Sequence, residues 1–430
     1  YALDITVPDS PKLLWHIDSS SSGYSELGQS WSQPRVGFSA LNISGGTANP
    51  VIFFGGGYDI SKDSSGAGTG DSVGRAMYMA DAKTGTLLWS LSPASGSANH
   101  TQVAALTDSI PASIGILDSD ADGLVDRLYA GDTGGNVWRV DMPGSSPDST
   151  DTPWTAFKLA QLGGTTNTDD RRFFSEPSIV RTLISDTIES SVTDEEGVTT
   201  TVVTRQERPY EAILIGSGDR STPSATDTDD KFFMVRDETV FTQSFSATST
   251  PPTPAAIEIT DLYDYTNDPF GQTMTTQERE TLELAVSSKS GWFVDYAGSG
   301  EKSLSAATAV AGVAYFTSFT PASGSNSNTC ELSAGAGVLY AVDLALGTTI
   351  YDWRQLSVGD RIPDTPTVII PPDDSSEHNK LLFVGVGKGT DGGTITLCSS
   401  DNCEQGDPDD DEPSISLKTM RTYLYVTEGQ

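Results

Sequence analysis

Four aspartates in one short segment give the clearest chemical signal in this sequence. The segment reads Asp118-Ser-Asp120-Ala-Asp122-Gly-Leu124-Val-Asp126, so carboxylates occupy loop positions 1, 3, 5 and 9. Carboxylates this close repel one another unless a cation lies between them. The same spacing, with glycine at position 6 for a sharp turn and a backbone carbonyl from position 7, is that of a calcium loop. We therefore predict a calcium site made by Asp118, Asp120, Asp122, Asp126 and the carbonyl of Leu124.

The residues that follow the segment indicate which element holds the loop. A helix-loop-helix calcium site ends with a bidentate glutamate at position 12, but position 12 here is Tyr129. Tyr129 lies in the run Arg127–Ala130, which is typical of a β-strand. We therefore expect the loop to lead into a strand. The alternative is a solvated acidic turn without metal.

Other acidic or polar segments are weaker candidates for a site. Asp227, Asp229 and Asp230 lie close together but have no turn glycine, so a solvated loop is favoured over a second ion. The acidic segment 401–412 is interpreted as a solvated tail. The Ser- and Gly-rich residues 61–72 are expected to be mobile.

The overall composition excludes one class of partner. The chain has 430 residues with 25 Lys and Arg against 59 Asp and Glu, a formal net charge of −34. Nucleic acid is not expected as a partner, because phosphate binding needs clusters of basic residues that are absent here. Divalent cations are the natural small partner. Abundant Gly, Ser and Thr with 36% hydrophobic residues favour a loop-rich all-β protein.

Cysteines and hydropathy bear on the compartment. Cys398 and Cys403 are spaced to close a small disulfide loop, which implies an oxidising compartment, and Cys330 is left over. No run of about twenty apolar residues occurs, so no transmembrane segment is expected. No signal peptide is visible, and the sequence opens in what reads as the middle of a strand, so we expect a piece of a longer precursor.

Two recurring phrases indicate the fold. The first, at Met77–Trp89 and Leu339–Trp353, is an apolar strand, an Asp–Gly turn and a second strand ending in an aromatic residue. The second is a short apolar strand that ends in Gly-x-Gly, as at Val51–Gly57, Ala212–Gly218 and Leu381–Gly387. An inner strand followed by an outer hairpin, repeated at irregular intervals, predicts an all-β protein, a β-propeller of about seven irregular blades.

We predict that residues 1–430 form a single propeller domain. The segment Tyr1–Trp15 resembles an outer hairpin without its inner strand, so N- and C-terminal strands are expected to complete one blade and close the ring. A capping box at Thr275–Glu278 predicts a short helix that continues to about Lys289. Insertions, one of them a long hairpin, are expected near 181–206, 219–230 and 260–290.

Four motifs also occur in a linked order: Leu27–Pro34, Gly55–Asp59, Asp118–Asp126 and Tyr129–Arg139. Together they resemble the C-terminal β-propeller domain of the PilY1/PilC family, whose members are type IV pilus biogenesis proteins and pilus-associated adhesins. The resemblance runs from Tyr1 through Leu424. It implies calcium in the Asp118–Asp126 loop and a role in pilus extension, retraction and surface attachment.

The same resemblance implies a location and partners. We expect export through the periplasm to the cell surface, with minor or major pilins as partners and a host or surface receptor as a further one. No Arg-Gly-Asp tripeptide occurs, so integrin binding is not carried over. The identity of the pilin or receptor stays open.

The main alternative is a quinone- and calcium-dependent periplasmic propeller dehydrogenase. The phrase Asp81–Trp89 also resembles the tryptophan-docking repeats of such enzymes, but their more regular array and adjacent-cysteine pair do not occur here. No Gly-x-Ser-x-Gly motif supports a hydrolase. We therefore predict a non-enzymatic module without catalytic residues. Trp31, Trp138 and Trp292 are expected to pack between sheets rather than against a carbohydrate.

Overall fold

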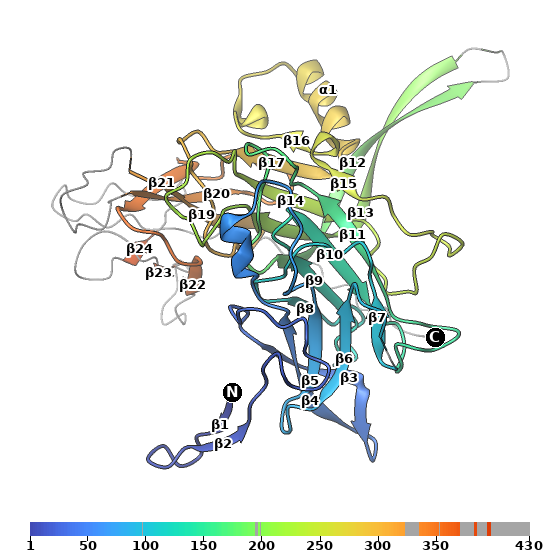
Figure 1. Cartoon of the computed structure of the whole chain (residues 1–430). Helices are drawn as coiled ribbons and strands as arrows, with labels where there is room; N and C mark the ends of the chain where they lie inside the picture. Colours follow the sequence, from blue (N-terminus) through green and yellow to red (C-terminus); the bar gives the residue numbers. More distant parts are fainter. Residues whose placement is uncertain are drawn as a thin grey trace, which may run out of the picture.

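A computed structural model describes residues 1–96, 98–193, 197, 199–322, 335–351, 353–369, 382–384 and 394–396 (Figure 1). The regular secondary structure of the described chain is almost entirely β-strand, and its sheets are arranged as a fan. This confirms the predicted all-β class and propeller architecture. Residues Cys330, Cys398, Cys403 and the acidic segment 401–412 lie outside the described residues.

The strands form sheets that are mainly antiparallel, with three parallel strand pairs, and the sheets follow one another in chain order. The first sheet contains β3 (Arg35–Ser44), β4 (Thr47–Gly55), β5 (Met77–Asp81), β6 (Leu87–Ser92) and β7 (His100–Gln102). The second contains β8 (Gly115–Leu117), β9 (Arg127–Gly131), β10 (Asn136–Asp141), β11 (Thr155–Gln161) and β15 (Ile257–Glu258). The third contains β12 (Ser178–Thr193), β13 (Thr199–Gly216), β14 (Lys231–Asp237), β17 (Gly291–Asp295) and β16 (Tyr263–Asp264).

The remaining elements are shorter. The fourth sheet contains β18 (Thr308–Val310), β19 (Val313–Thr320), β20 (Ala336–Asp343) and β21 (Gln355–Gly359). A three-stranded sheet contains β22 (Thr367–Ile369), β23 (Leu382–Val384) and β24 (Thr394–Thr396), and β1 (Ala2–Asp4) pairs with β2 (Lys12–Trp15). The helices are α1 (Thr276–Ser287) and the 3₁₀ turns η1 (Ile60–Ser64), η2 (Ile259–Asp261) and η3 (Pro269–Gly271).

The first strand of each sheet faces the axis of the fan. Contacts link β3 to β8, β8 to β12, β12 to β18 and β18 to β22. A cavity of about 440 Å³ lies among these strands, and Arg35 of β3 pairs with Glu176 at its wall. The apolar strands that end in glycine are therefore the second strands of their sheets, β4, β9 and β13. They are not the innermost strands, although the sequence predicts that they would be.

The outer hairpins agree with the repeated phrase. In the first sheet, β5 and β6 pair antiparallel across the turn that follows Asp81. Hairpin β1–β2 has the same form, and no strand other than these two is paired with it in the described part of the chain. The closure of the ring by N- and C-terminal strands stays a prediction, and so does the number of seven blades.

Successive loops alternate between two ends of the ring, because neighbouring strands run antiparallel. The Asp118–Asp126 loop, the end of the β12–β13 hairpin at Thr193 and Thr199, and residues 238–245 and 265–290 fall at one end, which we call the 118–126 end. The loops after β4, β9 and β13 fall at the other, the 219–230 end. The three expected insertions are therefore divided between the two ends.

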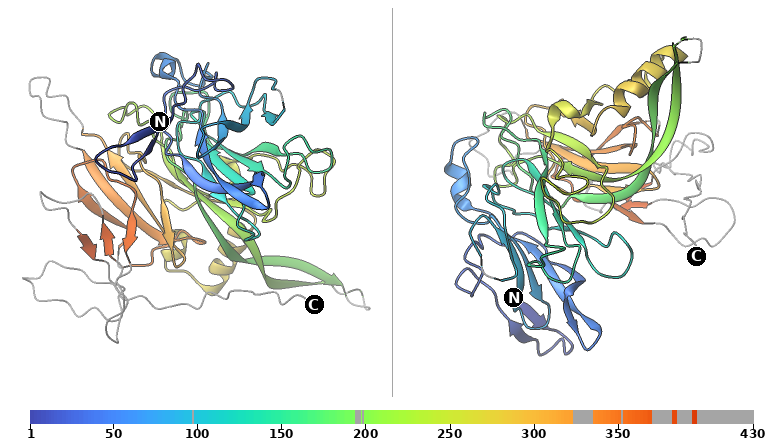
Figure 2. Two further views of the ribbon diagram at one scale, coloured as in Figure 1. Left: turned by 90° about the horizontal axis from the view of Figure 1, so that it is seen from below. Right: turned by 90° about the vertical axis from the view of Figure 1, so that its right-hand side faces the viewer.

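The long hairpin and the helix form a unit at the 118–126 end. Strands β12 and β13 pair continuously from Ser178–Leu214 to Thr193–Thr199, and α1 lies along the hairpin (Figure 2). Arg205 of the hairpin binds Glu283 of the helix at 2.7 Å. Thr275 and Glu278 form the predicted capping box, so both the hairpin and the helix are confirmed.

Aromatic side chains fill the spaces between sheets, with one exception to our prediction. Trp138 and Trp292 are buried, as expected. The prediction for Trp31 is wrong, since 61% of its surface is exposed. Trp31 lies in the segment before β3, outside the sheets, so no facing sheet covers it. None of the helices among the described residues is long and apolar enough to cross a membrane.

Candidate metal centre

The Asp118–Asp126 loop connects β8 to β9 as a hairpin turn. Leu117 and Arg127 are paired at its base. Backbone amides of Val125 and Asp126 donate to the carbonyls of Phe38 and Leu117 at 2.8 and 3.1 Å. The loop therefore leads into a strand and has a fixed base on the first and second sheets.

Three of the four aspartates converge in this loop. One carboxylate oxygen from each of Asp118, Asp120 and Asp122 lies within 4.8 Å of the other two. Calcium binds oxygen ligands at about 2.3–2.6 Å, so two oxygens on one ion are at most about 5 Å apart. The three side chains are partly or fully exposed to solvent, and their spacing fits a shared hard cation.

Left-handed backbone conformations turn these carboxylates inward. Ala121 has a φ of 63° and Gly123 a φ of 89°. The Asp118 carboxylate accepts hydrogen bonds from the amides of Asp122 and Gly123 at 3.2 and 2.8 Å. A Cβ at position 123 would meet no neighbouring atom, so space does not require glycine there. The positive φ does, because residues with a side chain rarely adopt it.

The other two predicted ligands are engaged differently. Asp126 accepts hydrogen bonds from the amide of Ser119 at 3.0 Å and from its hydroxyl, and it is not in the converging group. The amide of Leu124 donates to Asp122 at 2.8 Å. Metal ligation by Asp126 and by the Leu124 carbonyl stays a prediction.

Ser119 ties the loop to the third sheet. Its hydroxyl lies 3.0 Å from that of Thr242, and its carbonyl accepts a hydrogen bond from Arg181 at 2.6 Å. Arg181 also binds the fully buried Glu211, whose other oxygen binds Arg127 at 2.7 Å. The conformation of the loop is therefore linked to a buried charge network between the second and third sheets.

Sequence reasoning missed these supporting residues. Ser119 is one of many serines, and Thr242 lies more than a hundred residues away from the loop. The available signal was opposite charge at strand positions, as in Arg181 and Glu211. Opposite charges alone do not show which residues pair. The pairing of Arg181 with Glu211 depends on the register of β12 with β13, which the structure provides.

The second acidic segment does not converge on one point. Asp230 is buried and accepts a hydrogen bond from the Ser217 hydroxyl at 2.7 Å. Asp229 instead binds Lys231 at 2.8 Å. Within the described ranges, Asp118, Asp120 and Asp122 form the one group of three or more potential ligands that lie close enough for a metal.

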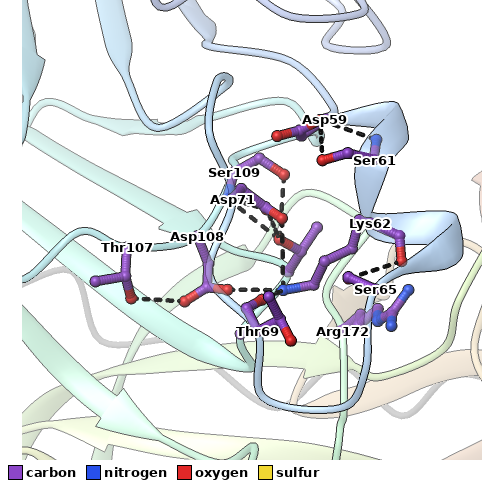
Figure 3. Close-up of polar contacts among 12 residues, drawn as sticks. Asp59, Ser61, Lys62, Ser65, Thr69, Asp71, Thr107, Asp108, Ser109 and Arg172 are labelled. Carbon is purple, nitrogen blue, oxygen red and sulfur yellow. Dashed lines mark hydrogen bonds and ion pairs between the residues drawn. The ribbon is translucent and has the colours of Figure 1, made fainter.

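Residues 61–72, expected to be mobile, are packed around a buried lysine (Figure 3). Lys62 donates to Asp108 at 2.8 Å and to the carbonyl of Thr69 at 2.5 Å, and it lies 3.5 Å from Asp71. Asp71 in turn accepts hydrogen bonds from the amide of Ser109 at 2.7 Å and from the hydroxyl of Thr133 at 2.6 Å. A buried charge needs such partners, so these contacts hold the loop in one conformation. The expectation of mobility, which rested on the Ser- and Gly-rich composition, was wrong.

One serine–histidine pair bears on the hydrolase alternative. The Ser90 hydroxyl lies 2.8 Å from Nδ1 of His100, and Nε2 of that ring lies 3.0 Å from the carbonyl of Ala94. The ring is thus oriented by a backbone carbonyl rather than by a carboxylate. This arrangement favours a structural role for His100.

Comparisons with known proteins agree with the propeller fold described above. Residues 1–186 match the family model of the PilY1 beta-propeller domain. The type IV pilus biogenesis factor PilY1 of Pseudomonas aeruginosa (strain UCBPP-PA14) is 30% identical over 220 residues, which are 51% of this chain and 16% of that protein. The PilY1 homolog of Xylella fastidiosa (strain Temecula1) is 23% identical over 357 residues, 81% of this chain and 21% of that protein. The chain thus spans about a fifth or less of the length of these relatives.

A solved structure supports the fold. The crystal structure of the Pseudomonas aeruginosa PilY1 C-terminal domain is similar with a TM-score of 0.51 at 16% identity, covering 88% of this chain and 76% of that one. A quinohemoprotein alcohol dehydrogenase from Comamonas testosteroni gives a TM-score of 0.33 at 11% identity, which is too low to bear on activity.

Proposed function

This chain belongs to the PilY1 family, and we propose that it is the calcium-binding propeller module of a type IV pilus biogenesis factor. The named relatives are type IV pilus biogenesis factors. In this proposal the module is exported, lies at the cell surface, and contacts pilins and a surface receptor. The observation that carries the calcium part is the convergence of Asp118, Asp120 and Asp122 within 4.8 Å.

The residues of the loop would hold the ion in a partly solvated shell. Asp118, Asp120 and Asp122 would supply carboxylate oxygens, and Asp126 and the Leu124 carbonyl would complete the protein ligands. Six to eight oxygens are usual for calcium, so water would supply the rest. Bound calcium supplies positive charge that offsets the repulsion among the aspartates.

The loop can act as a switch because its two states differ in charge balance. Without a cation, the aspartates repel one another and favour a looser loop. With a cation, one conformation is selected, since only that conformation gathers the ligands. Ser119 links this conformation to Thr242 and Arg181, so the surface at the 118–126 end would change with calcium.

Calorimetric titration of calcium into the chelator-treated chain tests this proposal. We expect one-site binding that weakens at least about tenfold in Asp122→Ala, because one of three converging carboxylates is lost. Asp122 is exposed, so the variant should keep the thermal unfolding of the wild type. Asp227→Ala is the matched control, since it removes an exposed carboxylate from the other acidic segment.

Each other outcome has a definite meaning. Loss of binding in Asp227→Ala but not in Asp122→Ala would move the ion to the 219–230 end. Absence of binding in the wild type would refute the calcium part and leave the family assignment standing. Pilus assembly and twitching of cells that carry Asp122→Ala in the full-length protein would then test the role in the pilus.

A further inference from the structure

A groove of about 420 Å³ lies beside the metal loop at the 118–126 end. Its walls are the Asp118–Asp126 loop, residues 142–145 and residues 240–242. Leu124, Met142, Pro143 and Phe241 give it apolar surface. We call it the Phe241 groove.

Phe241 is an exposed aromatic residue on a firmly held backbone. The residue is 48% exposed. Arg139 donates to the carbonyls of Thr239 and Phe241 at 2.7 and 3.0 Å. Arg127 donates to the carbonyl of Val240 at 2.6 Å. Both arginines are fully buried, so this short segment is anchored in the core.

Such an arrangement favours binding rather than stability. An exposed phenylalanine side chain contributes little to the stability of the fold. Its fixed backbone, however, reduces the conformational entropy that is lost when a partner docks. Aromatic side chains on rigid segments are typical anchors of protein interfaces. The groove therefore has a preorganised apolar contact point.

The charges around the groove indicate what kind of partner fits. Its charged lining residues are Asp120, Asp122 and Asp126, and no lysine or arginine of the described residues lines it. Even with one divalent cation bound, the four aspartates of the loop would leave a net negative charge. A partner with basic residues beside its apolar contact is therefore electrostatically complementary.

We propose that the Phe241 groove docks a polypeptide segment of a partner protein. The segment places a large apolar side chain against Phe241 and a lysine or arginine beside the acidic loop. The inference deepens the proposed function and rests on it only for the effect of calcium, since the metal loop forms one wall. The 3.0 Å contact between Ser119 and Thr242 joins that wall to the Phe241 segment.

A peptide selection tests the proposal on the full chain. A random peptide library is selected on the calcium-loaded protein, and enriched peptides are measured by fluorescence anisotropy. We expect an aromatic or aliphatic residue next to Lys or Arg, and about tenfold weaker binding to Phe241→Ser. Ile60→Ser is the matched control, because Ile60 is 62% exposed at the opposite end of the ring.

A second variant tests the charge requirement without touching Phe241 or a metal ligand. Ser145 is exposed in the groove wall, so Ser145→Lys adds a positive charge there. We expect it to weaken binding of the basic peptides, with a smaller effect at high salt. Thermal unfolding of each variant checks that the fold is retained.

Three results would overturn the proposal: no peptide enriched, enriched peptides that bind Phe241→Ser as well as the wild type, or enrichment of acidic peptides. Calcium titration of the same protein separates this failure from failure of the proposed function. Normal calcium binding without a Phe241-dependent peptide refutes the groove alone. Phe241-dependent binding that is equal in calcium and in chelator supports the groove and refutes the calcium response.

Discussion

Asp230 has unequal surroundings at its two carboxylate oxygens. Oδ1 accepts the hydrogen bond from Ser217, whereas Oδ2 is buried and has no hydrogen-bond partner among the described residues. Burial raises the pKa of Asp230 to about 6, and the Ser217 hydrogen bond opposes this rise. The folded protein therefore binds a proton at Asp230 more tightly than the unfolded chain does.

This difference predicts a pH dependence of stability. Its sign follows from linkage: a raised pKa in the folded state stabilises below about pH 4, and that stabilisation is lost as the pH rises through about 6. We expect Asp230→Asn to lack this component. The free energy of unfolding of the wild type relative to the variant should fall by about 2 kcal/mol between about pH 4 and pH 7.

Urea unfolding of both proteins across this pH range measures the effect. The comparison with Asp230→Asn removes the general effect of the net charge of −34, which both proteins nearly share. An equal difference in unfolding free energy at both ends of the range would contradict the raised pKa.

Single residues could be predicted from sequence where the reason is local. The glycine ending of the repeated apolar strand is such a case, because a Cβ at Gly55, at the end of β4, would lie 2.5 Å from the carbonyl oxygen of Ile110. The spacing of Asp118, Asp120 and Asp122 was equally local. The exposure of Trp31 and the burial of Lys62 depend on distant segments, so neither could be predicted from local sequence.

Between elements, a buried ion pair joins the second and third sheets. Arg127 starts β9, Glu211 lies in β13, and their side chains are both fully buried at 2.7 Å. Removing Glu211 leaves the buried Arg127 guanidinium without this carboxylate, and removing Arg127 leaves the buried Glu211 carboxylate with the half-exposed Arg181 as its remaining ion-pair partner among the described residues. Arg127→Met should therefore destabilise the protein by about 3–5 kcal/mol, measured by urea unfolding.

A double-mutant cycle measures the interaction free energy of Arg127 with Glu211 separately from their contacts with other residues. Arg127→Met combined with Glu211→Gln should recover part of the loss, since the unpaired charge is then gone. The pair of the exposed Arg205 with the partly buried Glu283 is the control, where Arg205→Ala should cost less than about 1 kcal/mol. Equal costs for Arg127→Met and Arg205→Ala would show that the buried pair does not join the sheets as described.

Elements could be predicted where their pattern is long or capped. The β12–β13 hairpin and helix α1 were anticipated from alternation and from the capping box. The innermost strands were missed because some, such as β8 with three residues, are too short to show a pattern. Their place is set by packing around the axis rather than by local propensity.

At the scale of the molecule, the two ends of the ring have different character. The 118–126 end carries the candidate calcium loop, the Phe241 groove, the long hairpin and α1. At the 219–230 end, loops are held by buried ion pairs such as those of Lys62. Calcium response and partner docking would thus share one end, which makes their coupling testable with substitutions at that end alone.

Hairpin β1–β2 presents the remaining question about the whole ring. Leu3, Leu13 and Leu14 are all exposed on it. An isolated two-stranded hairpin is at best marginally stable in water, and clustered exposed apolar side chains indicate a surface that is normally covered. The sequence predicts that strands from the two ends of the chain complete one blade, which would cover this hairpin and remove its free edges.

Hydrogen exchange of backbone amides tests that closure in the full chain. Amides within β1–β2 that bond across the hairpin are protected in either case, whereas those on its outer edges are protected only if another strand pairs there. Closure therefore predicts slow exchange of both sets, comparable with β5, which is paired on both sides. Outer-edge amides that exchange as fast as an exposed loop would refute closure, and the hairpin would then be free to pair with another polypeptide.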